Sequence, residues 1–76
     1  MTLRVDLEQW TLNALARLGG SGRIVPIARD VWDHHQADIA EYPDGLFTWQ
    51  YDMRWAAQSL AKKGQLKQAN GVWSLP

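Results

Sequence analysis

The stretch LKQANGVWSL, residues 66–75, carries the strongest structural signal in the chain. Asn70-Gly71 stands at its centre, and this pair favours a two-residue type I′ turn because both residues tolerate a positive φ. In the run that follows the turn, Trp73 and Leu75 alternate with a serine. The stretch therefore predicts a β-hairpin, residues 66–69 and 72–75, with one apolar face that can close a core.

The clearest helix of the chain is predicted just before this hairpin, between Thr48 and Gly64. Thr48 is a suitable N-terminal cap, and Gly64 is expected to end the helix because glycine accepts the left-handed conformation found there. Two lysines in the last turn complement the negative end of the helix dipole. Apolar side chains recur at helical spacing and predict the buried stripe: Trp49, Met53, Ala56 and Leu60, with Ala57 on its flank.

A first helix is predicted to begin at Asp6. The Asp6 side chain can cap the first turn, and Gln9 three residues later completes a capping-box pattern. Gly19-Gly20 is expected to end this helix. Leu12 falls off the buried stripe, so it is either covered by apolar residues near the N-terminus or faces a partner. The stripe itself consists of Leu7, Trp10, Ala14 and Leu18.

The middle of the chain predicts a short extended segment, a second helix and a loop. Ser21-Gly22 is typical of a turn, and residues 23–25 form the predicted extended segment. Pro26 suits the first position of a helix, which continues to His34 or His35. Residues 36–47 contain a strong turn signal and are predicted as a loop of about ten residues, although Ile39 and two alanines could extend the helix or form a short turn.

Three helices, a short strand after the first helix and a C-terminal hairpin make an α+β fold that is mainly α. This order is typical of a winged helix-turn-helix, in which the second and third helices form the helix-turn-helix and the hairpin forms the wing. We expect one such domain over residues 1–76, with residues 23–25 pairing with the hairpin as a third strand. The alternative, a helical bundle with a disordered tail, is disfavoured by Asn70-Gly71 and Trp73.

The composition fits a small folded domain and excludes several classes of protein. The 76 residues have a formal net charge of zero, 46% hydrophobic residues and five tryptophans. The lack of cysteine excludes a disulfide framework and cysteine-ligated metal sites. No apolar run is long enough to cross a bilayer, and the N-terminus lacks the apolar stretch of a signal peptide. We therefore expect a cytoplasmic protein without a membrane partner.

Charge is distributed unevenly along the chain. Residues 1–47 carry four arginines against seven carboxylates, a net charge of −3, whereas residues 48–76 carry four cations against Asp52 alone, a net charge of +3. This split predicts one basic surface on an otherwise acidic body. The local sign of the charge matters more for the attraction of phosphate groups than the total does.

The segment WQYDMRWAAQSLAKKGQLKQANGVWSL, residues 49–75, resembles the N-terminal domain of Mrr-type restriction endonucleases. That domain carries Arg-Trp-Ala near the start of its last helix, then a leucine, basic residues and a glycine, and then a hairpin that ends in Gly-x-Trp. LNALARLGGSGR, residues 12–23, also resembles the first helix and glycine-rich turn of the family. The matching residues in the last helix and hairpin are Arg54, Trp55, Ala56, Leu60, Lys62, Lys63, Gly64, Gly71 and Trp73.

The resemblance implies a winged-helix fold and a role in DNA binding ahead of a separate nuclease domain. Such enzymes are associated with the cutting of modified DNA. This chain has no nuclease domain, so the resemblance implies no cleavage activity here, and its residues 36–47 are acidic where family members vary. The implied role is the targeting module of a restriction or regulatory protein, either one domain of a longer chain or a small stand-alone relative.

The candidate DNA-binding residues lie on the face of the last predicted helix opposite its buried stripe, and on the wing. The last helix of a helix-turn-helix enters the major groove, where arginine can read guanine and glutamine can read adenine. We therefore expect Gln50, Arg54 and Gln58 nearest the bases. Phosphate contacts are expected from Thr48, Tyr51, Lys62, Lys63 and Lys67, with Asn70 at the wing tip. Trp55 is expected either against the wing or on the surface that faces DNA or a partner.

Other interpretations of these residues stay open. Arg54 could form ion pairs with Asp52 or the acidic loop, and the hairpin could be purely structural. The wing tip lacks arginine, which argues against minor-groove reading. A winged helix used for protein–protein association or dimerisation is the main alternative function. The neutral total charge, Leu12 and the high tryptophan content favour it.

Neither a metal site nor a catalytic site is predicted. His34-His35 lies beside Asp30, Asp33 and Asp38, but adjacent histidines point in different directions and a metal needs three or four convergent ligands. The chain offers no pair of nucleophile and base. We expect a binding module that is not an enzyme and needs no cofactor. Its expected partners are double-stranded DNA, modified or unmodified, and either a homodimer partner or a second domain.

Overall fold

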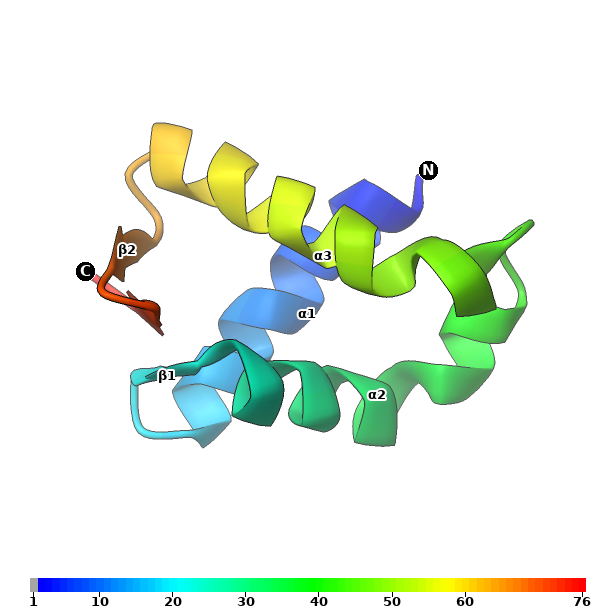
Figure 1. Ribbon diagram of the computed structural model, residues 1–76, viewed down its shortest axis with the longest axis horizontal. Helices are drawn as coiled ribbons and strands as arrows, with labels where there is room; N and C mark the ends of the chain where they lie inside the picture. The colour runs from blue at the N-terminus through cyan, green and yellow to red at the C-terminus, as the bar shows by residue number, and fades with distance from the viewer. Residues whose placement is uncertain (1) are drawn as a thin grey trace.

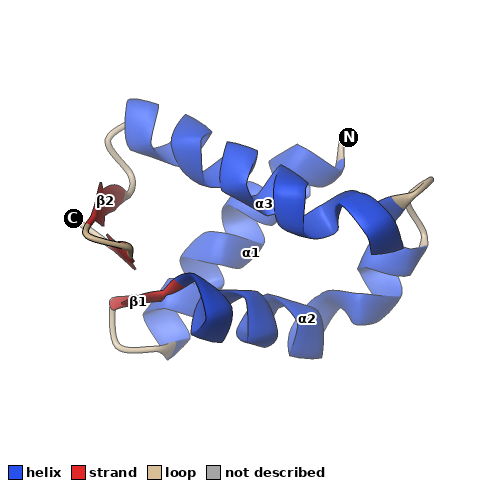
Figure 2. Cartoon of the chain, viewed as in Figure 1, coloured by secondary structure: helices blue, strands red, loops and turns tan. Residues whose placement is uncertain are grey.

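The computed structural model describes residues 2–76 and has a small α+β fold that is mainly helical. Three helices surround the core, and a three-stranded antiparallel sheet closes one end of it (Figure 1, Figure 2). The third helix runs along one edge of the molecule, and the first helix crosses behind the other two. The elements are α1 (Leu3–Arg17), β1 (Ser21–Arg23), α2 (Ile24–Ala40), α3 (Gly45–Lys62), β2 (Lys67–Ala69) and β3 (Val72–Ser74).

Helix α1 begins earlier than the prediction from Asp6. Thr2 is the N-cap, and its hydroxyl accepts a hydrogen bond from the Val5 amide at 3.3 Å. The earlier start buries Leu3, which lies one turn before Leu7 on the same face. Asp6 lies in the first turn, where its carboxylate accepts a hydrogen bond from the Tyr42 hydroxyl.

The predicted stripe of α1 is partly correct. Leu7 and Ala14 are fully buried, but Trp10 is only half-buried and Leu18 is exposed, because the helix ends at Arg17. Thr11 and Leu15 complete the buried face instead. The predicted glycine stop is confirmed, since Gly19 and Gly20 have φ values of 89° and 100°.

The extended segment lies two residues earlier than predicted, at Ser21–Arg23. It pairs with the hairpin as a third strand, as expected, and the strand order is β1-β3-β2. Helix α2 starts at Ile24, so Pro26 is its third residue and not its first. The amides of the first helical turn have no partner within the helix, and proline is therefore tolerated there.

The hairpin prediction is confirmed. Strands β2 and β3 pair in antiparallel register around Asn70 and Gly71, whose φ values of 54° and 76° fit a type I′ turn. Trp73 is 4% exposed, so the sheet closes the core with this side chain. Leu66, just before β2, is also buried.

The predicted loop over residues 36–47 is wrong, and the alternative, in which Ile39 and its neighbouring alanines extend the second helix, is confirmed. Helix α2 continues to Ala40 through a kink at His35, whose φ of −133° and ψ of 16° are not helical. The kink turns the last part of α2 so that Ile39 is fully buried. Only residues 41–44 connect α2 to α3.

Helix α3 begins three residues before the predicted cap Thr48. Asp44, with a φ of 59°, is its N-cap, and Gly45 is its first residue. Gly45 packs so closely on the end of α2 that a Cβ there would lie 2.2 Å from the Ile39 carbonyl oxygen. Thr48 lies inside the helix, and its hydroxyl donates a hydrogen bond to Asp52 at 3.1 Å.

The buried stripe of α3 is as predicted. Its side chains pack against α1 and α2, and the chain leaves the helix at Gly64, whose φ is 75°. The core consists of Leu3, Leu7, Ala14, Leu15, Ile27, Val31, Ile39, Trp49, Met53, Ala56, Ala57, Leu60, Leu66 and Trp73.

Candidate nucleic-acid interface

The outer face of α3 carries most of the predicted DNA-binding side chains. The helix presents this face to solvent because its opposite stripe is buried against α1 and α2. Thr48 is the one predicted residue of the helix that is half-buried and bonded within it. The predicted residues that lie exposed on α3 are Gln50, Tyr51, Arg54, Trp55, Gln58 and Lys62.

Three aromatic side chains stand exposed on α3, one turn apart. Phe47 is 90% exposed, Tyr51 60% and Trp55 44%. Phe47 was missed as a surface residue because it was predicted to lie in a loop, yet its spacing of four from Tyr51 already indicates a shared face. The Tyr51 and Trp55 rings meet edge to face, with centroids 6.2 Å apart.

Trp55 packs on its own helix and on α1. The Arg4 guanidinium lies over both aromatic rings, 5.7 Å from the Tyr51 centroid and 5.5 Å from that of Trp55. Its Nε also donates to Asp52 at 2.8 Å. Arg4 therefore holds the two rings in place on the outer surface.

A cleft of about 350 Å³ lies between α2 and α3, next to this face. Its aromatic floor includes Trp32 and Trp49, which stack with centroids 5.6 Å apart. Arg29 of α2 lines the cleft together with Gln50 and Arg54 of α3. Arg29 was missed by sequence reasoning, although position 29 falls off the buried face that Ile27 and Val31 define.

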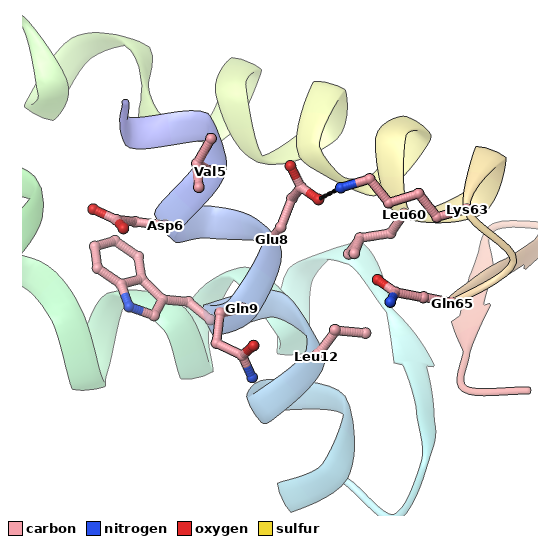
Figure 3. Close-up of a pocket in the computed structure, with 9 residues that line it drawn as sticks. Val5, Asp6, Glu8, Gln9, Leu12, Leu60, Lys63 and Gln65 are labelled. Carbon is pink, nitrogen blue, oxygen red and sulfur yellow. Dashed lines mark hydrogen bonds and ion pairs between the residues drawn. The ribbon is translucent and has the colours of Figure 1, made fainter. Parts of the chain in front are cut away.

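The cations that touch α1 are neutralised by ion pairs. Arg4 of α1 pairs with Asp52 of α3, and Arg17 of α1 pairs with Asp30 of α2 at 2.5 Å. The hydrogen bond to Asp30 raises the pKa of Arg17. Lys63 donates to Glu8 of α1 at 2.6 Å, as Figure 3 shows. These three pairs tie α1 to the other helices.

The remaining cations make no ion pair within residues 2–76. They belong to α2, α3 and the sheet. Arg54 in particular does not pair with Asp52, because Asp52 is occupied by Arg4 and Thr48. Lys63, predicted as a phosphate contact, is engaged with Glu8 instead. The unpaired cations are Arg23, Arg29, Arg54, Lys62 and Lys67.

The hairpin presents Lys67 and Asn70 to solvent, as predicted. An arginine also reaches its tip, contrary to the sequence interpretation. Arg23 of β1 extends beside the turn, and its Nη1 would lie 3.7 Å from a Cβ on Gly71. The strand pairing brings it there, since Arg23 is the register partner of Val72.

The two histidines make local contacts. His34 Nδ1 lies 2.8 Å from the Asp30 carbonyl oxygen, and His35 Nδ1 lies 3.0 Å from Asp38. The His35 ring stacks on Trp10 at 4.1 Å. In the part of the chain that the structure describes, no three metal-ligating side chains converge.

A larger groove of about 500 Å³ lies on the other side of α3, between it and α1 (Figure 3). Leu12 lines it, half-buried, beside Leu60. Asp6 and Glu8 also line it, and the Glu8–Lys63 ion pair spans it. These carboxylates make the groove unsuited to phosphate, so we place the candidate interface on the outer face of α3, the α2–α3 cleft and the hairpin.

Comparison with protein-family models, curated proteins and solved structures gave no match. Over residues 2–76, none of the helices has the length and hydropathy required to span a bilayer.

Proposed function

We propose that this chain is a winged-helix domain that binds double-stranded DNA, with α3 in the major groove and the β2–β3 hairpin as the wing. The element order and the strand order β1-β3-β2 support the winged-helix assignment. Helices α2 and α3 are then the helix-turn-helix, joined by the short turn at residues 41–44.

The separation of paired from unpaired cations carries this proposal. Ion pairs neutralise the α1 side, whereas five cations on α2, α3 and the sheet have no carboxylate partner among residues 2–76. Unpaired arginines and lysines are what a DNA backbone attracts, since each phosphate contact releases condensed counterions. The neutral total charge of the chain is therefore no obstacle to a local attraction between these cations and DNA.

Each part of this face has a proposed role. Arg54, Gln50 and Gln58 are the side chains that reach base edges, because they lie exposed along α3. Arg29 at the start of α2 contacts the backbone beside the cleft, as the first helix of a helix-turn-helix does. The unpaired cations near the hairpin, Arg23 and Lys67, contact phosphates at the wing.

The resemblance to Mrr-type N-terminal domains stays a prediction, and with it a role in targeting a restriction or regulatory protein. Because that family is associated with modified DNA, binding to methylated and unmodified duplexes should be compared. A cytoplasmic location belongs to this proposal.

Fluorescence anisotropy with a labelled duplex, methylated or unmodified, tests the proposal. We expect binding that weakens with salt, with a log–log slope of about −0.9 for each phosphate contact. Arg54→Ala should cost about 1–3 kcal/mol of binding free energy, because it removes a base contact. A preference for the methylated duplex would support the targeting role.

Arg17→Ala is the matched control for Arg54→Ala. It also removes an exposed helical arginine, but one that Asp30 neutralises. The control should bind DNA like the parent chain. The proposal fails if the folded protein shows no anisotropy change at low salt, or if Arg54→Ala binds as tightly as the control.

A further inference from the structure

The exposed aromatic stripe of α3 is only partly covered within residues 2–76, by Arg4 over the Tyr51 and Trp55 rings. Phe47, Tyr51 and Trp55 project from one face of the helix, and Phe47 is almost fully exposed. Isolated apolar side chains on a surface are ordinary, but a contiguous row of large rings indicates a contact surface. DNA binding through the unpaired cations does not account for this row of exposed rings.

Two residues of the stripe, Tyr51 and Trp55, belong to a longer pattern along the same side of the helix. Positions 44, 48, 51, 55, 58 and 62 are alternately four and three residues apart, which is the spacing of a seam between two packed helices. All but the half-buried Thr48 are exposed. In chain order the seam reads Asp44, Thr48, Tyr51, Trp55, Gln58 and Lys62.

This seam is complementary to itself when it is reversed. If two copies of α3 pack antiparallel about the level of Met53, Tyr51 meets Trp55 of the partner subunit, and Thr48 meets the partner's Gln58. Asp44 at the start of the helix meets the partner's Lys62 at the end. Neither of these two charges makes an ion pair within the described part of its own chain.

We propose that the outer face of α3 binds a second copy of this chain, forming an antiparallel two-fold dimer. The two-fold symmetry makes every contact twice, so each copy supplies one acidic and one basic end. The seam has an acidic residue at one end and a basic residue at the other. A second copy matches both ends, whereas a partner whose charges all have the same sign would match only one. The antiparallel arrangement also aligns the two helix dipoles favourably.

The dimer is expected to be weak. One helix from each copy buries less than the area of about 1,200–2,000 Å² that is usual for stable complexes. It covers five of the predicted DNA contacts: Thr48, Tyr51, Trp55, Gln58 and Lys62. DNA and a second copy should therefore compete for α3, but the dimer itself forms without DNA and does not depend on the proposed DNA-binding function.

Sedimentation equilibrium over a concentration series, without DNA, tests the dimer through its charges. We expect the weight-average mass to rise from monomer toward dimer. Lys62→Glu and Asp44→Lys should each weaken self-association, because each places like charges opposite one another. An equal mixture of the two variants should recover association, since every charge then meets its opposite.

Trp55→Ala tests the aromatic part of the seam, and we expect it to weaken self-association by about tenfold or more. Lys67→Glu and Val25→Ala are controls that change an unpaired cation and an exposed apolar residue outside the seam, and they should associate like the parent. The proposal is overturned if the parent stays monomeric to millimolar concentration. It is equally overturned if the mixture of charge variants associates no better than either alone.

Discussion

Gly45 fixes the junction between the second and third helices. Its first-turn position brings α3 against the end of α2, where even one added carbon would lie 2.2 Å from the Ile39 carbonyl oxygen. A backbone atom cannot rotate away as the end of a side chain can. The junction must therefore open to admit a larger residue, and Ile39 would lose its packing.

Gly45→Ala should lower the free energy of unfolding by about 1–3 kcal/mol, the usual cost of overpacking a tight contact. Urea unfolding followed by tryptophan fluorescence measures this loss. Gly22→Ala is the control, because a Cβ there would lie 3.4 Å from Leu18 Cδ1, an ordinary contact. Equal stability of the two variants would contradict the role given to Gly45.

Tyr42 links the turn between α2 and α3 to α1. Its hydrogen bond makes the stability of the fold depend on pH in the alkaline range. Its hydroxyl donates a hydrogen bond to the Asp6 carboxylate, which raises the pKa of Tyr42. The folded state then holds this proton more tightly than the unfolded chain does. The resulting stability is complete below the unfolded pKa of about 10 and is lost as pH rises through the folded pKa.

The Tyr42→Phe variant lacks this proton, so its stability should fall less steeply between about pH 10 and pH 12. Urea unfolding of parent and variant at several alkaline pH values gives the comparison. The advantage of the parent over the variant should shrink as pH rises. An advantage that stays constant across this range would show that the Asp6 hydrogen bond does not shift the titration of Tyr42.

At the scale of whole elements, the hairpin closes one end of the core with a single large side chain. Trp73 is 4% exposed and faces the helices from the central strand β3. Trp73→Ala should cost about 3–5 kcal/mol, much of the stability of a domain this small. Thermal unfolding followed by circular dichroism should show a variant that is largely unfolded or melts far below the parent.

Lys67→Ala, on the neighbouring strand, serves as the control for Trp73→Ala because Lys67 is exposed. It should melt within a few degrees of the parent, as surface substitutions usually do. If Trp73→Ala melted like this control, the hairpin would be an appendage and not part of the core.

Elements with local signals were predictable from the sequence. Asn70-Gly71 specifies its turn through its own backbone preferences, and the stripe from Trp49 to Leu60 repeats for three turns. The end of α2 was not predictable in this way. Residues 36–40 are helical because Ile39 is buried by residues that are distant in the chain. The kink at His35 interrupts the regular helical spacing, so Ile39 does not continue the pattern of Ile27 and Val31. Thr48 lost its predicted capping role for the same reason, since the junction at Gly45 starts α3 earlier.

The candidate site was predictable only in part. The spacing of α3 placed Gln50, Arg54 and Gln58 on one exposed face, as the structure has them. Which cations are free depends on partners far along the chain, as with Lys63 and Glu8, 55 residues apart. Arg23 reaches the hairpin tip because β1 pairs with β3. The strand β1 was predicted two residues too late in the chain, at residues 23–25.

At the scale of the whole molecule, the ion pairs separate two groups of cations. Arg4, Arg17 and Lys63 form ion pairs that involve α1, whereas the other five cations make no ion pair among residues 2–76. Lys63 and Arg29 represent the two groups. Lys63 joins α1 to the end of α3 through Glu8, and Arg29 lines the α2–α3 cleft with no ion pair to another of residues 2–76.

The Lys63→Gln and Arg29→Gln substitutions should therefore have opposite effects. Lys63→Gln should lower the free energy of unfolding by up to about 1 kcal/mol, as loss of an exposed ion pair does, and leave DNA affinity within about twofold. Arg29→Gln should leave stability within about 0.5 kcal/mol and reduce the salt slope of DNA binding by about 0.9. Urea unfolding and salt-dependent anisotropy measure the two quantities on the same samples. If both variants lost DNA affinity equally, the ion pairs of α1 would not separate the structural cations from the binding ones.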